Sequence, residues 1–261
     1  QRRPASWIEV DFSKRSTKIS CAHGGLGTIT KFLQRRPGAK VWSGSKSPAA
    51  SDGLMSGAPA QLEPFRPSRL WRGGHPQTVM GSIPLRRPLV ERRAHRLLSS
   101  TSDVILDCGR GVRLHGYYSP ATHVETSRGV AVLIHGWEGS SDSLYLLSTG
   151  AHLQARGYDV FRLNLRDHGP SHHLNPELFH SNRIHEVVGA VGHIQDLFPD
   201  RPLFLAGFSL GGNFALRVAL RAPARAIRLS KGGAVCPMLE PANTLAALES
   251  GWVTYRRYLL F

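Results

Sequence analysis

Residues 203–213 read LFLAGFSLGGN, and this stretch decides the fold. It begins as a short apolar strand pattern, passes through G-x-S-x-G at 207–211, and continues as an apolar helical pattern over 213–221. A strand that turns into a helix through this motif is typical of a nucleophile elbow, in which glycines let the backbone turn without side-chain collision. The helix N-terminus then places backbone N–H groups beneath the serine hydroxyl. The stretch therefore predicts that Ser209 is a nucleophile rather than part of a plain glycine turn.

Strand and helix patterns alternate on both sides of this motif. Strands are expected at 129–134, 158–165, 202–206 and 227–235, and helices at 143–156, 182–197 and 213–221. Such alternation implies right-handed crossovers and a mainly parallel, doubly wound sheet, so the expected fold class is α/β. Further upstream, the ranges 96–101, 102–107 and 112–118 are expected to form antiparallel strands around a glycine turn at 108–111.

The composition limits the classes of protein to consider. The 261 residues can form one large core, and no apolar run approaches the roughly 18 residues that a membrane-spanning helix needs. The first residues have no apolar segment of the signal-peptide kind. Three widely spaced cysteines predict neither a disulfide framework nor a zinc site. We therefore expect a reduced, cytoplasmic setting.

The net charge of +15 is unevenly distributed along the chain. Residues 1–100 hold 18 Lys and Arg against 5 Asp and Glu, whereas residues 101–261 hold 15 against 13. Residues 1–62 are rich in Gly, Ser, Pro and basic residues, and we expect a poorly ordered leader there. A second region, 63–261, is expected to form the folded domain. The basic leader is compatible with peripheral contact with an anionic membrane, but no pattern indicates a specific nucleic-acid site.

A second motif, HGWEG at 135–139, follows the buried strand at 129–134. In an open α/β sheet, loops at the carboxyl ends of the strands form the active crevice. An oxyanion hole needs two N–H donors, one from the residue after the nucleophile and one from such an earlier loop. We expect these donors to be the backbone N–H groups of Leu210 and Trp137. A structural histidine on a glycine-rich turn is the alternative interpretation.

A third motif, NLRDHG at 164–169, places Asp167 beside His168. Adjacent residues on a turn rarely reach the same nucleophile, and the usual chain order in such sites is serine, acid, then histidine. We therefore expect this loop to shape the floor of the pocket. The nearby histidines have no acidic partners at a convincing metal-ligand spacing, so no metal site is predicted; they are His168, His172, His173 and His180.

Five segments carry a resemblance to a known family: HPQT at 75–78, HGWEGSS at 135–141, NLRDHG at 164–169, LFHS at 178–181 and GFSLGGN at 207–213. Together they resemble the YheT-like branch of the α/β-hydrolase superfamily, which is related to the ABHD1/2/3-type hydrolases. The resemblance covers about residues 64–261 and leaves residues 1–60 unmatched. It implies the α/β-hydrolase fold and ester hydrolysis through an acyl-enzyme, with neither a metal nor an organic cofactor.

The end of the sequence departs from this family pattern. The family has two further core strands, with the triad acid after the first and the triad histidine after the second, and a helical cap over the site. After Ser209, however, the sequence has no histidine, and its acidic residues are Glu240 and Glu249. Residues 245–261 look like the start of the cap. We therefore expect a domain that is incomplete at its C-terminus, with the last strands and most of the cap missing and an exposed sheet edge.

The expected function is that of a carboxylesterase-type serine hydrolase acting on a small-molecule acyl ester. Its triad acid and histidine are expected beyond residue 261, although Glu240 is an alternative acid in a permuted arrangement. A serine without a base is a weak nucleophile, so a catalytically inactive remnant or a binding module is a second hypothesis. Acyl transfer by the same elbow is a third, because a fold does not determine one reaction. The sequence indicates neither the ester nor the oligomeric state.

Overall fold

The computed structural model describes residues 7–11, 18–21, 68–69, 84–122 and 124–249. The chain divides into two units, and the elements considered below lie in the larger one, which comprises residues 5–23 and 86–261, except that residues 84 and 85 of one short turn belong to the smaller unit. Most of the expected leader at 1–62 and the HPQT segment at 75–78 lie outside the described residues. The expected boundary between leader and domain therefore stays a prediction.

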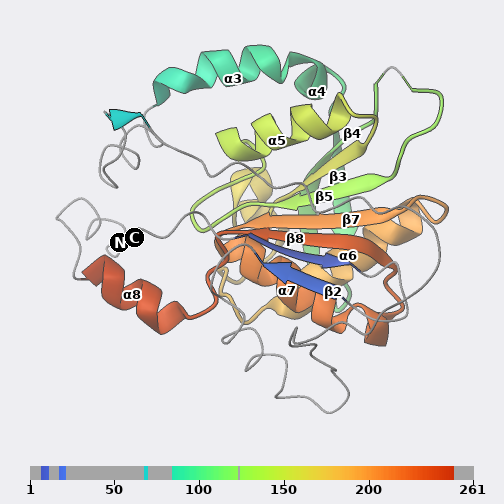
Figure 1. The fold of residues 1–261 in the computed structure, drawn as a ribbon. Helices are drawn as coiled ribbons and strands as arrows, with labels where there is room; N and C mark the ends of the chain where they lie inside the picture. Colours follow the sequence, from blue (N-terminus) through green and yellow to red (C-terminus); the bar gives the residue numbers. More distant parts are fainter. Residues whose placement is uncertain (1–6, 12–17, 22–67, 70–83, 123, 250–261) are drawn as a thin grey trace, which may run out of the picture. The chain divides into compact units, whose positions relative to one another are not determined.

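The described strands form one sheet with parallel strands at its centre (Figure 1). Its strands are β1 (Trp7–Asp11), β2 (Lys18–Cys21), β3 (Ser102–Asp107), β4 (Arg113–Ser119), β5 (Val130–Ile134), β6 (Asp159–Leu163), β7 (Leu203–Phe208) and β8 (Leu229–Val235). The order across the sheet is β2-β1-β8-β7-β5-β6-β4-β3. The pairs joining β8, β7, β5 and β6 are parallel, and the pairs at both ends are antiparallel. This arrangement confirms the α/β class.

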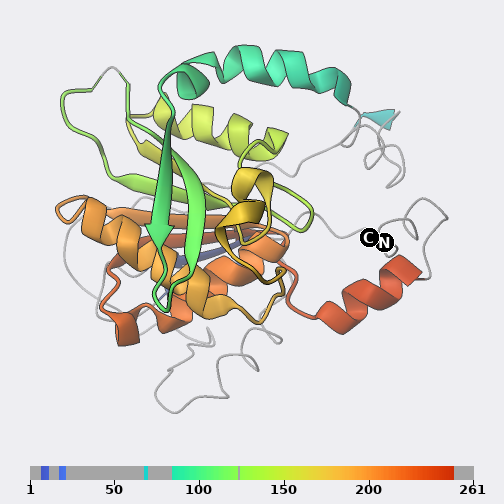
Figure 2. The same ribbon diagram turned by 180° about the vertical axis from the view of Figure 1, so that it is seen from behind.

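Helices cover both faces of the sheet (Figures 1 and 2). One face carries α3 (Arg87–Arg93), α4 (His95–Ser99) and α5 (Leu144–Gln154), and the other carries α6 (Ile184–Leu197) and α7 (Leu210–Arg221). Shorter elements are the 3-10 turns η2 (Pro84–Arg86), η3 (Gly169–Leu174) and η4 (Pro223–Arg225), and the chain continues into helix α8 (Pro241–Glu249). The sheet is thus doubly wound, as the strand–helix alternation predicts.

The alternation of side chains along β5 explains why both faces are covered. Val130, Val132 and Ile134 point into the core shared with α6 and α7, and Leu133 points into a second core shared with α3, α4 and α5. All five residues of the strand are buried. Because each fully buried Val, Leu or Ile side chain contributes about 1.5–3 kcal/mol, a strand of this composition needs a helical layer on each side.

The expectation of a strand at residues 96–101 is wrong, because α4 occupies residues 95–99. Val90, Ala94 and Leu97 are buried and follow one another at intervals of four and three residues. This is the spacing of one helical face, and these residues pack against α5 in the second core. The other two expected strands of this region are present as β3 and β4, which pair antiparallel around the turn at 108–111.

The edge of β8, which was expected to be exposed, is instead paired in the described residues, and β2 is the edge strand on that side. β1 pairs antiparallel with β8, and β2 pairs with β1. An open strand edge presents unpaired N–H and C=O groups, which an extended segment of the same chain can satisfy. β1 and β2 fall within the range 1–62, and the poorly ordered leader expected over that range stays a prediction.

Helix α8 begins four residues before the expected cap helix at 245–261. The remainder of that expected helix, residues 250–261, lies outside the described residues. Within the described residues, no helix combines the length and the apolar character needed to cross a membrane.

Candidate active site

Ser209 stands alone between β7, which ends at Phe208, and α7, which begins at Leu210. Its backbone has φ 53° and ψ −114°, and the residue is exposed. A positive φ is unusual for a residue with a side chain, and such strain often occurs at functional sites. The strand–turn–helix context predicted for the G-x-S-x-G motif is therefore present, with the serine at the top of the turn.

The two glycines of the motif are required by close backbone contacts. A Cβ atom on Gly207 would lie 2.0 Å from the carbonyl oxygen of Gly211, and one on Gly211 would lie 2.2 Å from the carbonyl oxygen of His135. Both distances are far below van der Waals contact. Only glycine at these two positions lets β7 turn into α7 while α7 begins against the end of β5.

Strained backbone marks the whole carboxyl edge of the parallel strands. Four residues other than glycine have positive φ angles there: Glu138 after β5 (55°), Asp167 after β6 (61°), Ser209 after β7 (53°) and Cys236 after β8 (47°). In open α/β sheets this edge holds the ligand crevice. The repeated strain therefore points to the same edge as the serine motif.

The turn after β5 lies directly against the serine. A Cβ atom on Gly136 would be 3.3 Å from the Cβ atom of Ser209. Gly139 N–H donates to the carbonyl oxygen of Gly136 at 3.1 Å and closes the turn. Gly136 N–H in turn donates to the hydroxyl of Tyr145 on α5 at 3.0 Å. The structure thus brings the HGWEG motif and the elbow together, and Tyr145 is a positioning residue that the sequence analysis did not find.

Both expected oxyanion donors stand at this contact. Leu210 is the first residue of α7, where the helix leaves backbone N–H groups without an intrahelical acceptor. Trp137 is the next residue after Gly136 in the turn, and its side chain is 43% exposed. Among the described residues, no backbone carbonyl accepts a hydrogen bond from the Trp137 N–H. Their role as donors to a bound oxyanion stays a prediction.

His135 is a buried structural histidine in this site. Its Nε2 accepts a hydrogen bond from Leu165 N–H at 3.1 Å, so its Nδ1 carries the proton and donates to the carbonyl oxygen of Gly136 at 2.7 Å. Burial lowers the pKa of His135 to about 4, which keeps the ring neutral. Because both ring nitrogens are engaged, His135 joins the ends of β5 and β6 and is not available as a base.

Asn164 fixes the far end of the same loop. Its Oδ1 accepts from Ser141 N–H at 2.8 Å, and its Nδ2 lies 2.9 Å from His115 Nδ1 on β4. The other ring nitrogen of His115 lies 2.8 Å from Asp103 Oδ1. Asn164, Ser141 and His115 are buried, so this chain of hydrogen bonds satisfies polar groups that would otherwise be costly. The network holds the loop at 135–141 in place.

A buried arginine on β6 also supports this loop. Arg162 is 1% exposed, and its Nη1 donates to the carbonyl oxygen of Ser141 at 2.9 Å and to Asp142 Oδ1 at 3.2 Å. Burial lowers the pKa of Arg162. The sequence analysis missed Arg162 because a single arginine inside an apolar strand pattern gives no indication of its partners.

The NLRDHG loop is anchored in the same way. Arg166 is buried and forms a bidentate ion pair with Glu186 of α6, with an Nη2–Oε1 distance of 2.7 Å. His168 Nδ1 is hydrogen-bonded to the carbonyl oxygen of Arg166, and the ring lies 4.8 Å from that of His135. These contacts agree with the interpretation of the loop as scaffold.

Asp167 pairs with a histidine other than its neighbour His168. Its Oδ1 lies 2.5 Å from Nδ1 of His172, which is exposed. Among the described residues, no group of three or more His, Cys, Asp or Glu side chains is placed to hold a metal ion. In the same part of the chain, no hydrogen bond joins the Ser209 hydroxyl to another residue.

Comparison with known proteins identifies the type of fold. Residues 130–252 match the family model described as alpha/beta hydrolase fold. The chain has an α/β-hydrolase fold, as the sequence resemblance predicts.

Its relatives include two kinds of ABHD protein. The chain is 31% identical over 176 residues to Abhydrolase domain-containing protein 2 of Drosophila melanogaster, covering 64% of this chain and 40% of that protein. It is 23% identical over 218 residues to Phospholipase ABHD3 of Homo sapiens, covering 79% and 50%. The chain therefore spans about half or less of the length of these curated relatives. A solved α/β serine hydrolase without a lid from Xanthomonas campestris is 21% identical, covering 49% of this chain and 58% of that chain, with a TM-score of 0.41.

Proposed function

We propose that this protein is a carboxylic ester hydrolase that acts through a Ser209 acyl-enzyme. One observation carries the proposal: an exposed serine on a strained turn lies against the Gly136–Gly139 turn at the carboxyl edge of a parallel sheet. In such a site the serine Oγ attacks the ester carbonyl, the alcohol leaves, and water then hydrolyses the acyl-enzyme. The N–H groups of Leu210 and Trp137 stabilise the oxyanion in both steps.

The general base is the part of the mechanism that the described residues do not supply. His135 is engaged at both nitrogens, and no histidine follows Ser209 in the sequence. The proposal therefore assigns neither the triad acid nor the triad histidine to a described residue. An oxyanion hole and substrate binding without the base retain a residual part of the catalysis, whereas loss of a triad member costs several orders of magnitude.

The substrate class follows from the same proposal. Human ABHD3 is named a phospholipase, and this relationship supports a lipid ester as a substrate of this chain. We therefore propose an acyl ester of small to medium size or a lipid ester, hydrolysed without a metal or organic cofactor, in a protein placed in the cytoplasm. The alternative is a non-catalytic binding module, which is favoured by the absence of a hydrogen-bonded base on Ser209 among the described residues.

Hydrolysis of an activated short-chain ester by the native protein tests the proposal. Ser209→Ala should lower the rate by about 10³-fold or more, because it removes the nucleophile. Ser181→Ala, which changes another exposed serine, should leave the rate unchanged. Equal rates for the native protein and Ser209→Ala would refute ester hydrolysis at this site and support the binding module.

A further inference from the structure

The segment at residues 86–99, which contains α3 and α4 and the last residue of η2, is an amphipathic, strongly basic surface element. Residues 86–99 contain five arginines and one glutamate. The buried stripe of Val90, Ala94 and Leu97 faces the core, and all five arginines are exposed. The single acidic side chain, Glu91, pairs with Arg87 four residues earlier. The outward face of this segment therefore carries a clear excess of positive charge.

Two adjoining hollows are lined by this segment and by α5. The first has a volume of about 460 Å³ and lies against Gln154 and Ala155 at the end of α5; the second has a volume of about 490 Å³ and lies against Ser148 and Thr149. They share Arg93 and Ala151, and we call them together the arginine groove. Their basic lining residues are Arg86, Arg92, Arg93, His95, Arg96 and His152.

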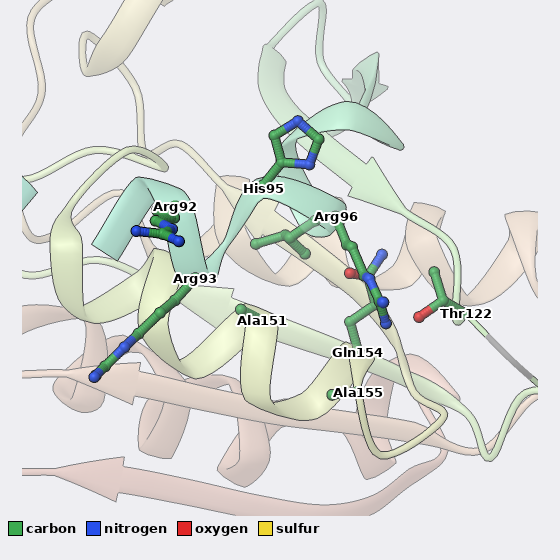
Figure 3. Close-up of a pocket in the computed structure, with 9 residues that line it drawn as sticks. Arg92, Arg93, His95, Arg96, Thr122, Ala151, Gln154 and Ala155 are labelled. Atoms are coloured by element: carbon green, nitrogen blue, oxygen red, sulfur yellow. The ribbon is translucent and has the colours of Figure 1, made fainter. Parts of the chain in front are cut away.

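The chemistry of the arginine groove suits phosphate groups. In the first hollow, Arg96 lies at the end of α5 and Thr122 supplies a hydroxyl (Figure 3). The amide of the neighbouring Gln154 is buried and donates to Ser100 Oγ and to the carbonyl oxygen of Pro120. A guanidinium group presents a planar fork of donors that matches phosphate oxygens. α5, which forms the opposite wall, contains no acidic residue.

The apolar part of the groove favours a lipid surface over a free anion. Leu89 is 51% exposed and lines the second hollow beside Arg86 and Arg93. Arg86, Leu89 and Arg93 line the second hollow, and Arg93 and Arg96 line the first, so these four residues border adjoining surfaces. A helix that combines exposed arginines with an exposed leucine is suited to the interface of an anionic bilayer.

We propose that the arginine groove binds the phosphate groups of anionic phospholipids and docks the protein on a bilayer surface. The N-terminal end of α3 adjoins the loop of the candidate active site, since Arg87 Nη2 donates to the carbonyl oxygen of Asp142 at 3.5 Å. Docking through this groove would therefore hold that loop close to the lipid surface. The proposal concerns binding and is independent of ester hydrolysis, so Ser209→Ala should dock as the native protein does.

Sedimentation of the whole chain with vesicles at physiological salt tests the groove. The chain should bind vesicles of phosphatidylcholine with phosphatidylserine and show little binding to phosphatidylcholine alone. Each arginine near an anionic surface contributes about a factor of five to binding. The triple variant R92Q/R93Q/R96Q should therefore lower the partition coefficient by about a hundredfold.

The matched control removes the same charge from other elements. R110Q/R113Q/R225Q changes three exposed arginines outside the groove and should keep binding within about threefold of native, because screening limits charge effects to about 10 Å. Equal loss in both triple variants, or equal binding to both vesicle types, would overturn the proposal. Displacement by low millimolar inorganic phosphate at constant ionic strength would assign the groove to free phosphate and also overturn it. If R92Q/R93Q/R96Q also lost about a hundredfold of its affinity for a short DNA duplex, the groove would attract polyanions in general. That result would overturn the proposal as well.

Discussion

At the carboxyl edge of the sheet the candidate functional groups are backbone N–H groups and one serine hydroxyl, whereas in the arginine groove they are exposed guanidinium groups. The edge depends on close backbone contacts at Gly207 and Gly211 and on buried hydrogen bonds around Asn164. The groove depends on side chains that project from a helix whose other face is packed. At the carboxyl edge, the contacts that form the candidate site therefore also stabilise the fold. In the arginine groove, the candidate binding groups are not needed for folding. Substitutions at the edge should destabilise the protein, and those in the groove should change only its binding.

The strongest test of this coupling is Gly211→Ala. The added Cβ would lie 2.2 Å from the carbonyl oxygen of His135, so either β5 or α7 has to move. We expect the free energy of unfolding to fall by about 4 kcal/mol or more, measured by urea titration. Gly192→Ala in α6 is the matched control, because its added Cβ would meet only Ile227 Cδ1 at 3.9 Å. That change should be neutral or stabilise the helix by about 1 kcal/mol. Similar costs for both variants would contradict the close contact.

The buried ion pair beneath the NLRDHG loop should show the next largest effect. Glu186→Gln leaves the buried Arg166 guanidinium without its carboxylate, so we expect a loss of about 3–5 kcal/mol in the free energy of unfolding. Glu91→Gln breaks an exposed pair with Arg87 on α3 and should cost about 1 kcal/mol or less. If Glu186→Gln and Glu91→Gln lowered the free energy of unfolding equally, burial of the ion pair would not explain a difference between the edge and the groove.

His135 should make the edge sensitive to acid. Its pKa is lowered to about 4 by burial, against an ordinary value of about 6.5 in the unfolded chain. The unfolded chain therefore binds this proton first, and stability that is present above pH 6.5 is lost as the pH falls toward 4. The shift corresponds to about 3 kcal/mol. Unfolding curves should show this loss of stability between pH 6.5 and 4 in the native protein. The loss should persist in His152→Gln, which changes an exposed histidine, and should be absent in His135→Gln.

The smallest effect on stability is expected in the groove. The triple variant R92Q/R93Q/R96Q changes exposed side chains on a helix whose packed stripe is untouched, and Gln has a helix propensity close to that of Arg. Its free energy of unfolding should stay within about 1 kcal/mol of native by urea titration. A larger loss would mean that the groove is part of the fold in the same way as the edge.

The parts of the fold that depend on local patterns could be predicted from the sequence. The runs at 129–134 and 202–206 are apolar enough to be buried strands, and they appear as β5 and β7. The G-x-S-x-G turn was located to the residue because glycine spacing and helix start are local signals. The helical spacing of Val90, Ala94 and Leu97 is also a local pattern. Because arginines and Pro88 interrupt it in the sequence, a strand was predicted over part of this segment.

The supporting residues of the site could not be predicted in this way. Tyr145, Arg162 and Glu186 act on loops that are distant in sequence, and each looks ordinary in its own element. Their partners are defined by which strands lie side by side in the sheet. The pairing of β1 with β8 joins residues more than 200 positions apart, so no local pattern could indicate it.

By itself, the sequence determined the α/β class, the elbow at Ser209 and the family resemblance, because strand period, helix period and glycine turns are encoded within a few residues. Only the tertiary structure decided that the HGWEG turn contacts Ser209, that His135 is engaged at both ring nitrogens, and that arginines of α3 and α4 form a groove with α5. These properties depend on burial and on distances between separate elements. Burial lowers the pKa of a histidine and makes a glycine indispensable, and the approach of two helices makes a set of arginines into one surface.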